Sequence, residues 1–145
     1  MGQYWLPVNL DKKEFVDPHK LGTGLKLWEQ LANQHGTGSA LIILTAAMPD
    51  RRGGGDLQEA EIIGQWAGDR IAIVGDYAED TDLPEQFNAA SIYDACQEGE
   101  YKDVSAEVCA VMERELDIKF TGTGWRDIED AGKAKSVNQT VENSA

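Results

Sequence analysis

The segment MPDRRGGGDLQE, residues 48–59, combines residue types that can bind an anion. Two adjacent arginines supply charge-assisted hydrogen-bond donors, and three consecutive glycines let backbone amides approach a phosphate closely. Asp56 and Glu59 have the spacing of a helix capping box, so a helix that begins here would add the positive end of its dipole. Ligands of open α/β sheets bind beyond the carboxyl ends of strands, and an acidic residue about 20 positions further on can contact a ribose hydroxyl. The residues of this predicted phosphate or nucleotide site are Arg51, Arg52, Gly53, Gly54, Gly55, Asp56 and Asp76.

The known phosphate-binding motifs are incomplete in this segment. A Walker loop needs Gly-Lys-Ser/Thr, but Asp56 and Leu57 stand where the lysine and hydroxyl would be. A dinucleotide fingerprint could begin at Gly53 and Gly55, but Gln58 occupies the place of its third glycine. A surface connection without a ligand is therefore the alternative interpretation.

A second candidate is the acidic segment GDYAEDTD, residues 75–82. Mg²⁺ is held by one or two carboxylates together with phosphate oxygens, so carboxylates that follow a strand could bind it. The spacing matches no calcium loop, because the central glycine and the terminal glutamate are missing. A solvated acidic turn is the alternative.

The remaining chemistry-bearing residues do not form a catalytic pattern. His19 and His35 accompany no nucleophile motif such as G-x-S-x-G. Cys96 and Cys109 fall in helix-like segments without zinc-ligand spacing, so we expect reduced thiols in the core. We expect no metal site of known spacing and no cofactor, and the sequence leaves open whether the chain catalyses any reaction.

Composition excludes several classes of protein. The 145 residues include 26 acidic and 13 basic side chains, a formal net charge of −13, which disfavours nucleic acid as the partner. An acidic surface suits a basic partner, a metal ion or a salt-rich environment. No apolar run reaches the length of about 18 residues that a membrane span needs, and the N-terminus lacks the pattern of a secretory signal. We therefore expect a cytoplasmic protein with no membrane contact.

In the first half of the chain, apolar periodicity predicts the elements that would position these residues. Residues 4–10 carry apolar side chains at every second position and, with the turn DKKE, predict a hairpin. Pro7 has no N–H to donate, so its strand is expected at or near an edge of the sheet. An apolar stripe over residues 21–32 predicts a helix that Gly36 terminates. Residues 40–47 are apolar on both faces and predict a central strand, with a short buried helix as the alternative. With a helix after Asp56 and a second central strand at residues 70–75, this order predicts a βαβ unit.

The second half is predicted to be more helical. Residues 84–97 and 105–116 each have one apolar face, with Ser105 as N-cap, and residues 118–122 predict a short strand. All four tryptophans are expected in or near the core, with display of Trp125 as an aromatic anchor beside Arg126 as the alternative, because its flanks are loop-like. Residues 132–145 are small and polar and predict a disordered tail. The predicted fold class is α/β (mixed α+β): one domain over residues 1–131, with a small mixed sheet and helices on both faces.

Four segments, MGQYW, NLDKKEFVDPHK, RRGGGD and WAGDRIAIVGDY, resemble an uncharacterised family of small microbial proteins with the same opening. The resemblance extends to about Asp127. It implies a single stand-alone domain, and it implies no activity, substrate, cofactor or catalytic residue.

Because no catalytic constellation or complete phosphate motif is present, we expect a non-catalytic binding or regulatory module with a protein partner. The alternative is a small enzyme or sensor that binds a phosphorylated or nucleotide ligand at the Arg51–Asp56 loop, with Asp76 as a ligand or metal contact.

Overall fold

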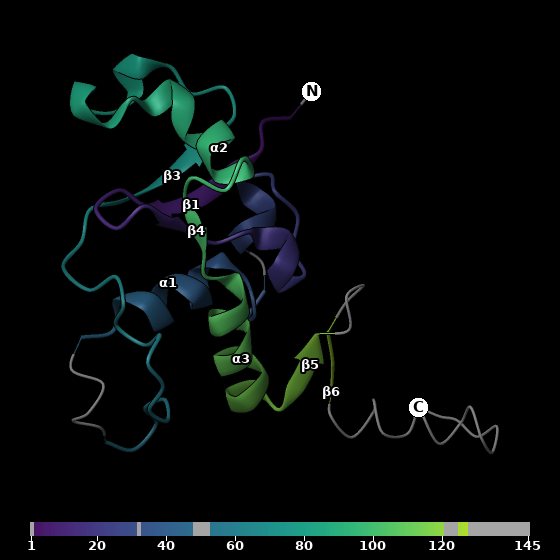
Figure 1. Cartoon of the computed structure of the whole chain (residues 1–145). Helices are drawn as coiled ribbons and strands as arrows, with labels where there is room; N and C mark the ends of the chain where they lie inside the picture. The colour runs from purple at the N-terminus through teal and green to yellow at the C-terminus, as the bar shows by residue number, and fades with distance from the viewer. Residues whose placement is uncertain (1, 32, 48–52, 121–124, 128–145) are drawn as a thin grey trace.

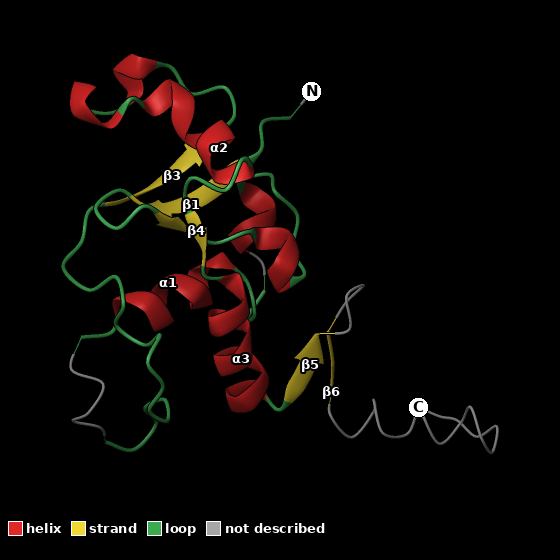
Figure 2. Ribbon diagram, in the orientation of Figure 1, coloured by secondary structure: helices red, strands yellow, loops and turns green. Residues whose placement is uncertain are grey.

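A four-stranded mixed sheet with the order β3-β1-β2-β4 forms the centre of the molecule (Figures 1 and 2). The computed structural model describes residues 2–31, 33–47, 53–120 and 125–127, the last three as backbone. Strand β1 is antiparallel to both of its neighbours, and β2 is parallel to β4. The strands are β1 (Trp5–Asn9), β2 (Glu14–Phe15), β3 (Ile71–Gly75) and β4 (Lys102–Asp103).

Three α-helices, four short 3₁₀-helices and a two-stranded antiparallel ribbon complete the described residues. The α-helices are α1 (Thr37–Thr45), α2 (Ala89–Gln97) and α3 (Ser105–Leu116). The 3₁₀-helices are η1 (Pro18–Leu21), η2 (Trp28–Leu31), η3 (Asp80–Asp82) and η4 (Glu85–Phe87). The ribbon pairs β5 (Ile118–Phe120) with β6 (Trp125–Asp127).

Two hydrophobic clusters lie on opposite faces of the sheet. Side chains alternate along a strand, so Leu6 and Val8 point to one face, where they pack with Ile92 and Cys96 of α2. On the other face, Val16 packs with α1, α3 and the fully buried Trp66. Figure 1 accordingly has α2 on one side of the sheet and α1 and α3 on the other. The predicted α+β class, with a small mixed sheet and helices on both faces, is confirmed.

The N-terminal hairpin is confirmed, and its first strand lies near an edge of the sheet as predicted, beside the edge strand β3. β1 pairs on both sides. Pro7 is tolerated there because its missing N–H falls on the side of the two-residue β2, one position beyond the end of that strand. The Pro7 carbonyl still accepts a hydrogen bond from Val16 N at 3.0 Å.

The predicted βαβ unit does not exist. Residues 40–47 lie mostly in α1, the alternative that the apolar run left open, so β3 is an edge strand antiparallel to β1. The predicted helix after Asp56 is a series of turns over residues 61–68, because Gly64 and Gly68 have φ values of 80° and 83° that a right-handed helix cannot contain. Ile62, Ile63 and Trp66 are nevertheless buried as predicted.

The predicted helix over residues 21–32 is also wrong. η1 ends at Leu21, where Gly22 adopts a left-handed cap with φ 80°, and the chain then runs as loop until η2. Gly36 does not terminate a helix but stands at the N-cap of α1. As a result, Leu21 is buried whereas Trp28 and Leu31 face solvent.

The C-terminal elements agree with their predicted patterns. Helix α3 and strand β5 lie where the sequence placed them, although the capping group of α3 differs. Of the helix predicted over residues 84–97, only residues 89–97 form α2, because Asn88 has a φ of 51° and separates α2 from η4. Ser105 N donates to Oδ1 of Asp103 at 2.8 Å, so Asp103 rather than Ser105 supplies the cap. The predicted tail, residues 132–145, lies outside the described residues.

Candidate functional site

A single turn around η2 exposes three large apolar side chains. Trp28 is 82% exposed, Leu31 is 63% exposed and Leu27 is 45% exposed. We call these three residues the apolar turn. An isolated exposed leucine is ordinary, but an exposed tryptophan beside two leucines is an apolar patch that water solvates poorly.

The apolar turn is held in place by a buried glutamine. Gln30 is only 2% exposed, and its Nε2 donates to the carbonyl oxygens of Trp5 and Leu25, both at 2.9 Å. Its Oε1 accepts from Thr37 Oγ1 at 2.9 Å. One side chain therefore ties the turn to strand β1 and to the start of α1, and Trp28 is displayed from a fixed support.

A groove between α1 and α3 is the second candidate surface. It encloses about 410 Å³, a volume in the range of small-molecule sites. Its floor is apolar and includes Ile43, Val111 and Met112, while Ile42 at the wall is 68% exposed. Four polar residues are also among those that line it: Gln34, Ser39, Asp56 and Glu115.

The glycine loop meets this groove, but not as the start of a helix. Gly55 and Asp56 line the groove, and Oδ2 of Asp56 accepts a hydrogen bond from Gly53 N at 2.6 Å. The Asp56 carboxylate thus accepts a hydrogen bond from a backbone amide of its own loop. A bound anion would need that amide as a donor, so the carboxylate competes with it. Arg51 and Arg52 lie outside the described residues.

The structure does not bring Asp76 together with the glycine loop. Asp76 follows β3 beside the N-terminal segment, where Oδ1 accepts from Tyr4 N and its own N–H donates to Tyr4 O, both at 2.9 Å. The glycine loop follows α1 on the other face of the sheet (Figure 1).

The acidic segment after β3 uses its carboxylates to order its own backbone. Glu79 and Asp82 form a capping box around η3, in which Asp82 Oδ2 accepts from Glu79 N at 2.8 Å. Oδ1 of Asp80 accepts from Ala90 N at the start of α2. Among the described residues, no group of three or more His, Cys, Asp or Glu side chains could hold a metal ion.

Both thiols are poor nucleophiles. Burial raises the pKa of Cys96 to about 12 and that of Cys109 to about 11, so each stays protonated near neutral pH. Neither cysteine is in a disulfide. His35 Nδ1 lies 3.0 Å from the carbonyl oxygen of Leu21, which ties the ring to the end of η1.

Two residues that matter here were given no functional role in the sequence analysis. Gln30 sits inside a stripe that was interpreted as helical, and Trp28 was expected to be buried. The available signal was local: Gly22 and Gly24 interrupt the stripe, and the adjacent pair Leu27–Trp28 cannot lie on one narrow helical face.

The chain matches no protein-family model, no curated protein and no solved structure. The family resemblance of its four segments therefore stays a prediction. None of the helices in the described residues has the length and apolar character that crossing a bilayer requires.

Proposed function

We propose that this chain is a non-catalytic binding module that docks on a protein partner through the apolar turn. The observation that carries the proposal is the 82% exposure of Trp28 on a support that Gln30 holds rigid. Tryptophan is the residue most enriched among interface hot spots, and a preorganised anchor loses little entropy when it enters a pocket.

The surroundings of the apolar turn also suit a protein interface. Polar residues Lys26, Glu29 and Asn33 flank the apolar side chains, which matches the polar rim of a typical interface. The partner surface that fits is an apolar pocket wide enough for an indole ring.

The test replaces Trp28 with a photoreactive benzoylphenylalanine and irradiates the protein in an extract of its source cells. The matched control carries the same group at Tyr77, which is also exposed. We expect one discrete adduct from position 28 and none from position 77, and mass spectrometry then identifies the partner.

Affinity for the identified partner provides the decisive measurement. Trp28→Ala should weaken binding about 30-fold or more, the loss expected of a hot-spot residue, while Tyr77→Ala leaves it unchanged. The melting temperature should stay constant because the Trp28 side chain makes few contacts. Equal affinity of both variants would exclude the apolar turn as the interface.

The second candidate function is ligand binding at the Arg51–Asp56 loop, and the groove beside Gly55 and Asp56 favours it. An apolar part of a ligand would fill the groove while an anionic part contacted the glycine amides. The carboxylates of Asp56 and Glu115 oppose an anion there, and for this reason the apolar turn is the leading proposal. Calorimetric titration with ATP, NAD and inorganic phosphate, with and without Mg²⁺, tests this candidate.

A further inference from the structure

Strand β3 forms one edge of the sheet, and among the described residues the outward backbone groups of its first part, at Ile71 and Ile73, have no hydrogen-bond partner. Asp76 N donates to Tyr4 O and Leu10 N donates to Arg70 O, so the even-numbered residues of this segment face β1. Backbone groups alternate in direction along a strand, so Ile71 and Ile73 face away from β1. Within the part of the chain that the structure describes, nothing bonds to the N–H or C=O of these two residues.

A hollow of about 350 Å³ borders this edge. Its lining includes Ile73 and Gly75 of β3, Gln3 and Trp5 of the N-terminal segment, and Tyr77, Asp82 and Leu83 of the segment that follows β3. Ile71, nearer the start of the strand, is 38% exposed. At the other end the edge is closed, because Gly75 O accepts a hydrogen bond from Ala78 N at 3.2 Å.

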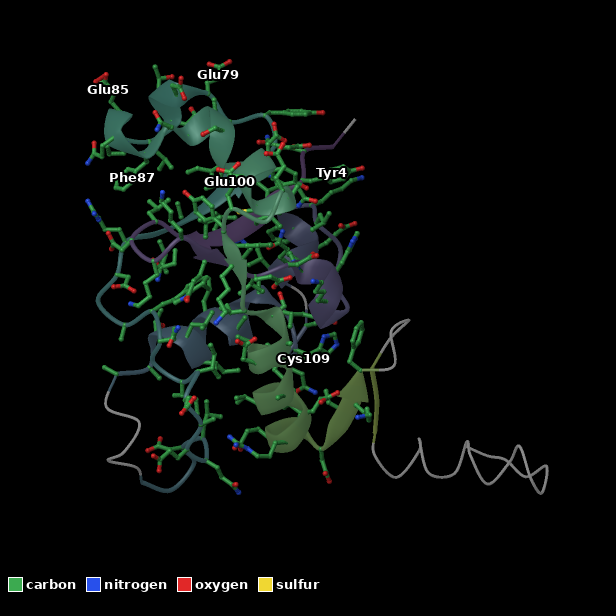
Figure 3. All side chains as sticks on the ribbon, viewed as in Figure 1. Tyr4, Glu79, Glu85, Phe87, Glu100 and Cys109 are labelled. Atoms are coloured by element: carbon green, nitrogen blue, oxygen red, sulfur yellow. The ribbon has the colours of Figure 1, made fainter. Side chains whose placement is uncertain are left out.

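Acidic residues predominate around this edge. Arg70, which precedes Ile71, is paired with Asp11 and lies over the ring of Phe87, 4.8 Å from its centroid. Residues 71–101 comprise β3, η3, η4 and α2, and they contain no Lys, Arg or His. Their acidic residues are Asp76, Glu79, Asp80, Asp82, Glu85, Asp94, Glu98 and Glu100. None of these carboxylates takes part in a salt bridge with another described residue. Figure 3 shows Glu79 and Glu85 projecting from the end of the molecule that carries β3 and α2.

We propose that the edge of β3 binds an extended, basic peptide segment of another protein as an added strand. Backbone hydrogen bonds to Ile71 and Ile73 supply affinity that does not depend on sequence, and the surrounding carboxylates select Lys and Arg side chains. A second copy of the chain is a poor occupant, because pairing two such edges would bring two acidic stretches together. This surface is separate from the apolar turn, so either proposal can fail without the other.

The test uses a capped synthetic peptide that alternates valine with lysine, titrated into the ¹⁵N-labelled protein. We expect the largest amide shifts at Ile71 and Ile73, and binding that weakens as salt is added. Two control peptides carry N-methyl groups on alternate amides. One set of methyl groups blocks the hydrogen-bonding edge and should abolish binding, while the other set, on the opposite edge, should leave it intact.

Two protein variants separate charge from backbone pairing. Asp82→Asn keeps an acceptor for Glu79 N but removes a charge from the hollow, and it should weaken binding about threefold to tenfold at low salt. Asp117→Asn, on the exposed residue after α3, is the matched control and should have no effect. Ile73→Pro removes an outward N–H that the sheet does not use, and it should abolish binding.

Three results would overturn the proposal. The valine-lysine peptide fails to bind, or both N-methylated peptides bind equally well, or sedimentation shows that the protein dimerises and that Ile73→Pro converts it to a monomer. The N-methylated peptides act on the native protein, so the decision does not depend on the folding of any variant.

Discussion

At the scale of single residues, Gln30 is the polar group on which the apolar turn depends. Replacing it with alanine removes three hydrogen bonds and leaves the Trp5 carbonyl and the Thr37 hydroxyl without these partners in a buried site. We expect Gln30→Ala to lower the free energy of unfolding by about 2–3 kcal/mol. The exposed Gln86 is the matched control, and Gln86→Ala should change stability by less than about 0.5 kcal/mol. Urea denaturation measures both, and equal midpoints would show that the turn is held by other contacts.

A second residue-scale prediction concerns Asp103, which caps α3 and pairs with Lys20 at 2.6 Å. Burial pushes the pKa of Asp103 upward, but hydrogen bonds from Lys20 and Ser105 outweigh burial and hold the pKa below its usual range. The unfolded chain therefore takes up this proton at a higher pH than the folded chain does. The stabilisation is complete above about pH 4 and is lost as the pH falls from there through the lowered pKa of the folded state.

The measurement is the urea midpoint at a series of pH values from about 6 down to about 2.5, for the wild type and for Asp103→Asn. The variant should be less stable at pH 6 and should lose less stability as the solution is acidified. Parallel curves would mean that Asp103 does not contribute to acid denaturation.

At the scale of elements, α1 can be stabilised by changing one glycine. Gly38 lies in its first turn, where an added Cβ would meet no atom within 4 Å, and its φ is not positive. Gly38→Ala should therefore raise the free energy of unfolding by about 0.5–1 kcal/mol. Gly68 has equal space but a φ of 83°, so Gly68→Ala should destabilise the protein. Thermal unfolding of the two variants should shift in opposite directions, and a shift in the same direction would contradict the assignment of α1.

The elements that could be predicted are those with two chemically different faces. β1, α2 and α3 alternate apolar and polar residues at the period of a strand or a helix, so their type and buried face follow from the spacing. Residues 40–47 are apolar on every side, so their spacing does not distinguish a strand from a helix. Only their contacts with neighbouring residues decide that they form α1 rather than a strand. The turns over residues 61–68 depend on Gly64 and Gly68, which helical spacing alone does not reveal.

The candidate site was predictable only in part. Gly55 and Asp56 do border a groove, as a loop that joins elements often does. The prediction that Asp76 lies near them assumed a parallel βαβ unit. Because the structure contains no such unit at these residues, the prediction is wrong. The role of Gln30 arises from contacts with Trp5 and Thr37, which no local spacing encodes.

At the scale of the whole molecule, the two proposed surfaces differ in their chemistry. The apolar turn recognises its partner by burial of an indole ring, which depends little on salt. The edge of β3 recognises its partner by backbone pairing and by charge, which salt screens. A partner that engaged both would gain affinity from two linked contacts, provided that its own chain could span them.

The net charge of −13 predicts opposite effects of salt on folding and on binding. Mutual repulsion among carboxylates destabilises the compact state, and the Debye length falls from about 30 Å at 0.01 M salt to about 10 Å at 0.1 M. Stability should therefore rise across this range, because the unpaired acidic residues at 71–101 outnumber the salt bridges that screening weakens. Urea midpoints measure the first effect, and the affinity of the valine-lysine peptide, which should fall across the same range, measures the second. A decrease in stability with added salt would show that the ion pairs of Asp11, Asp69 and Asp103 outweigh the repulsion.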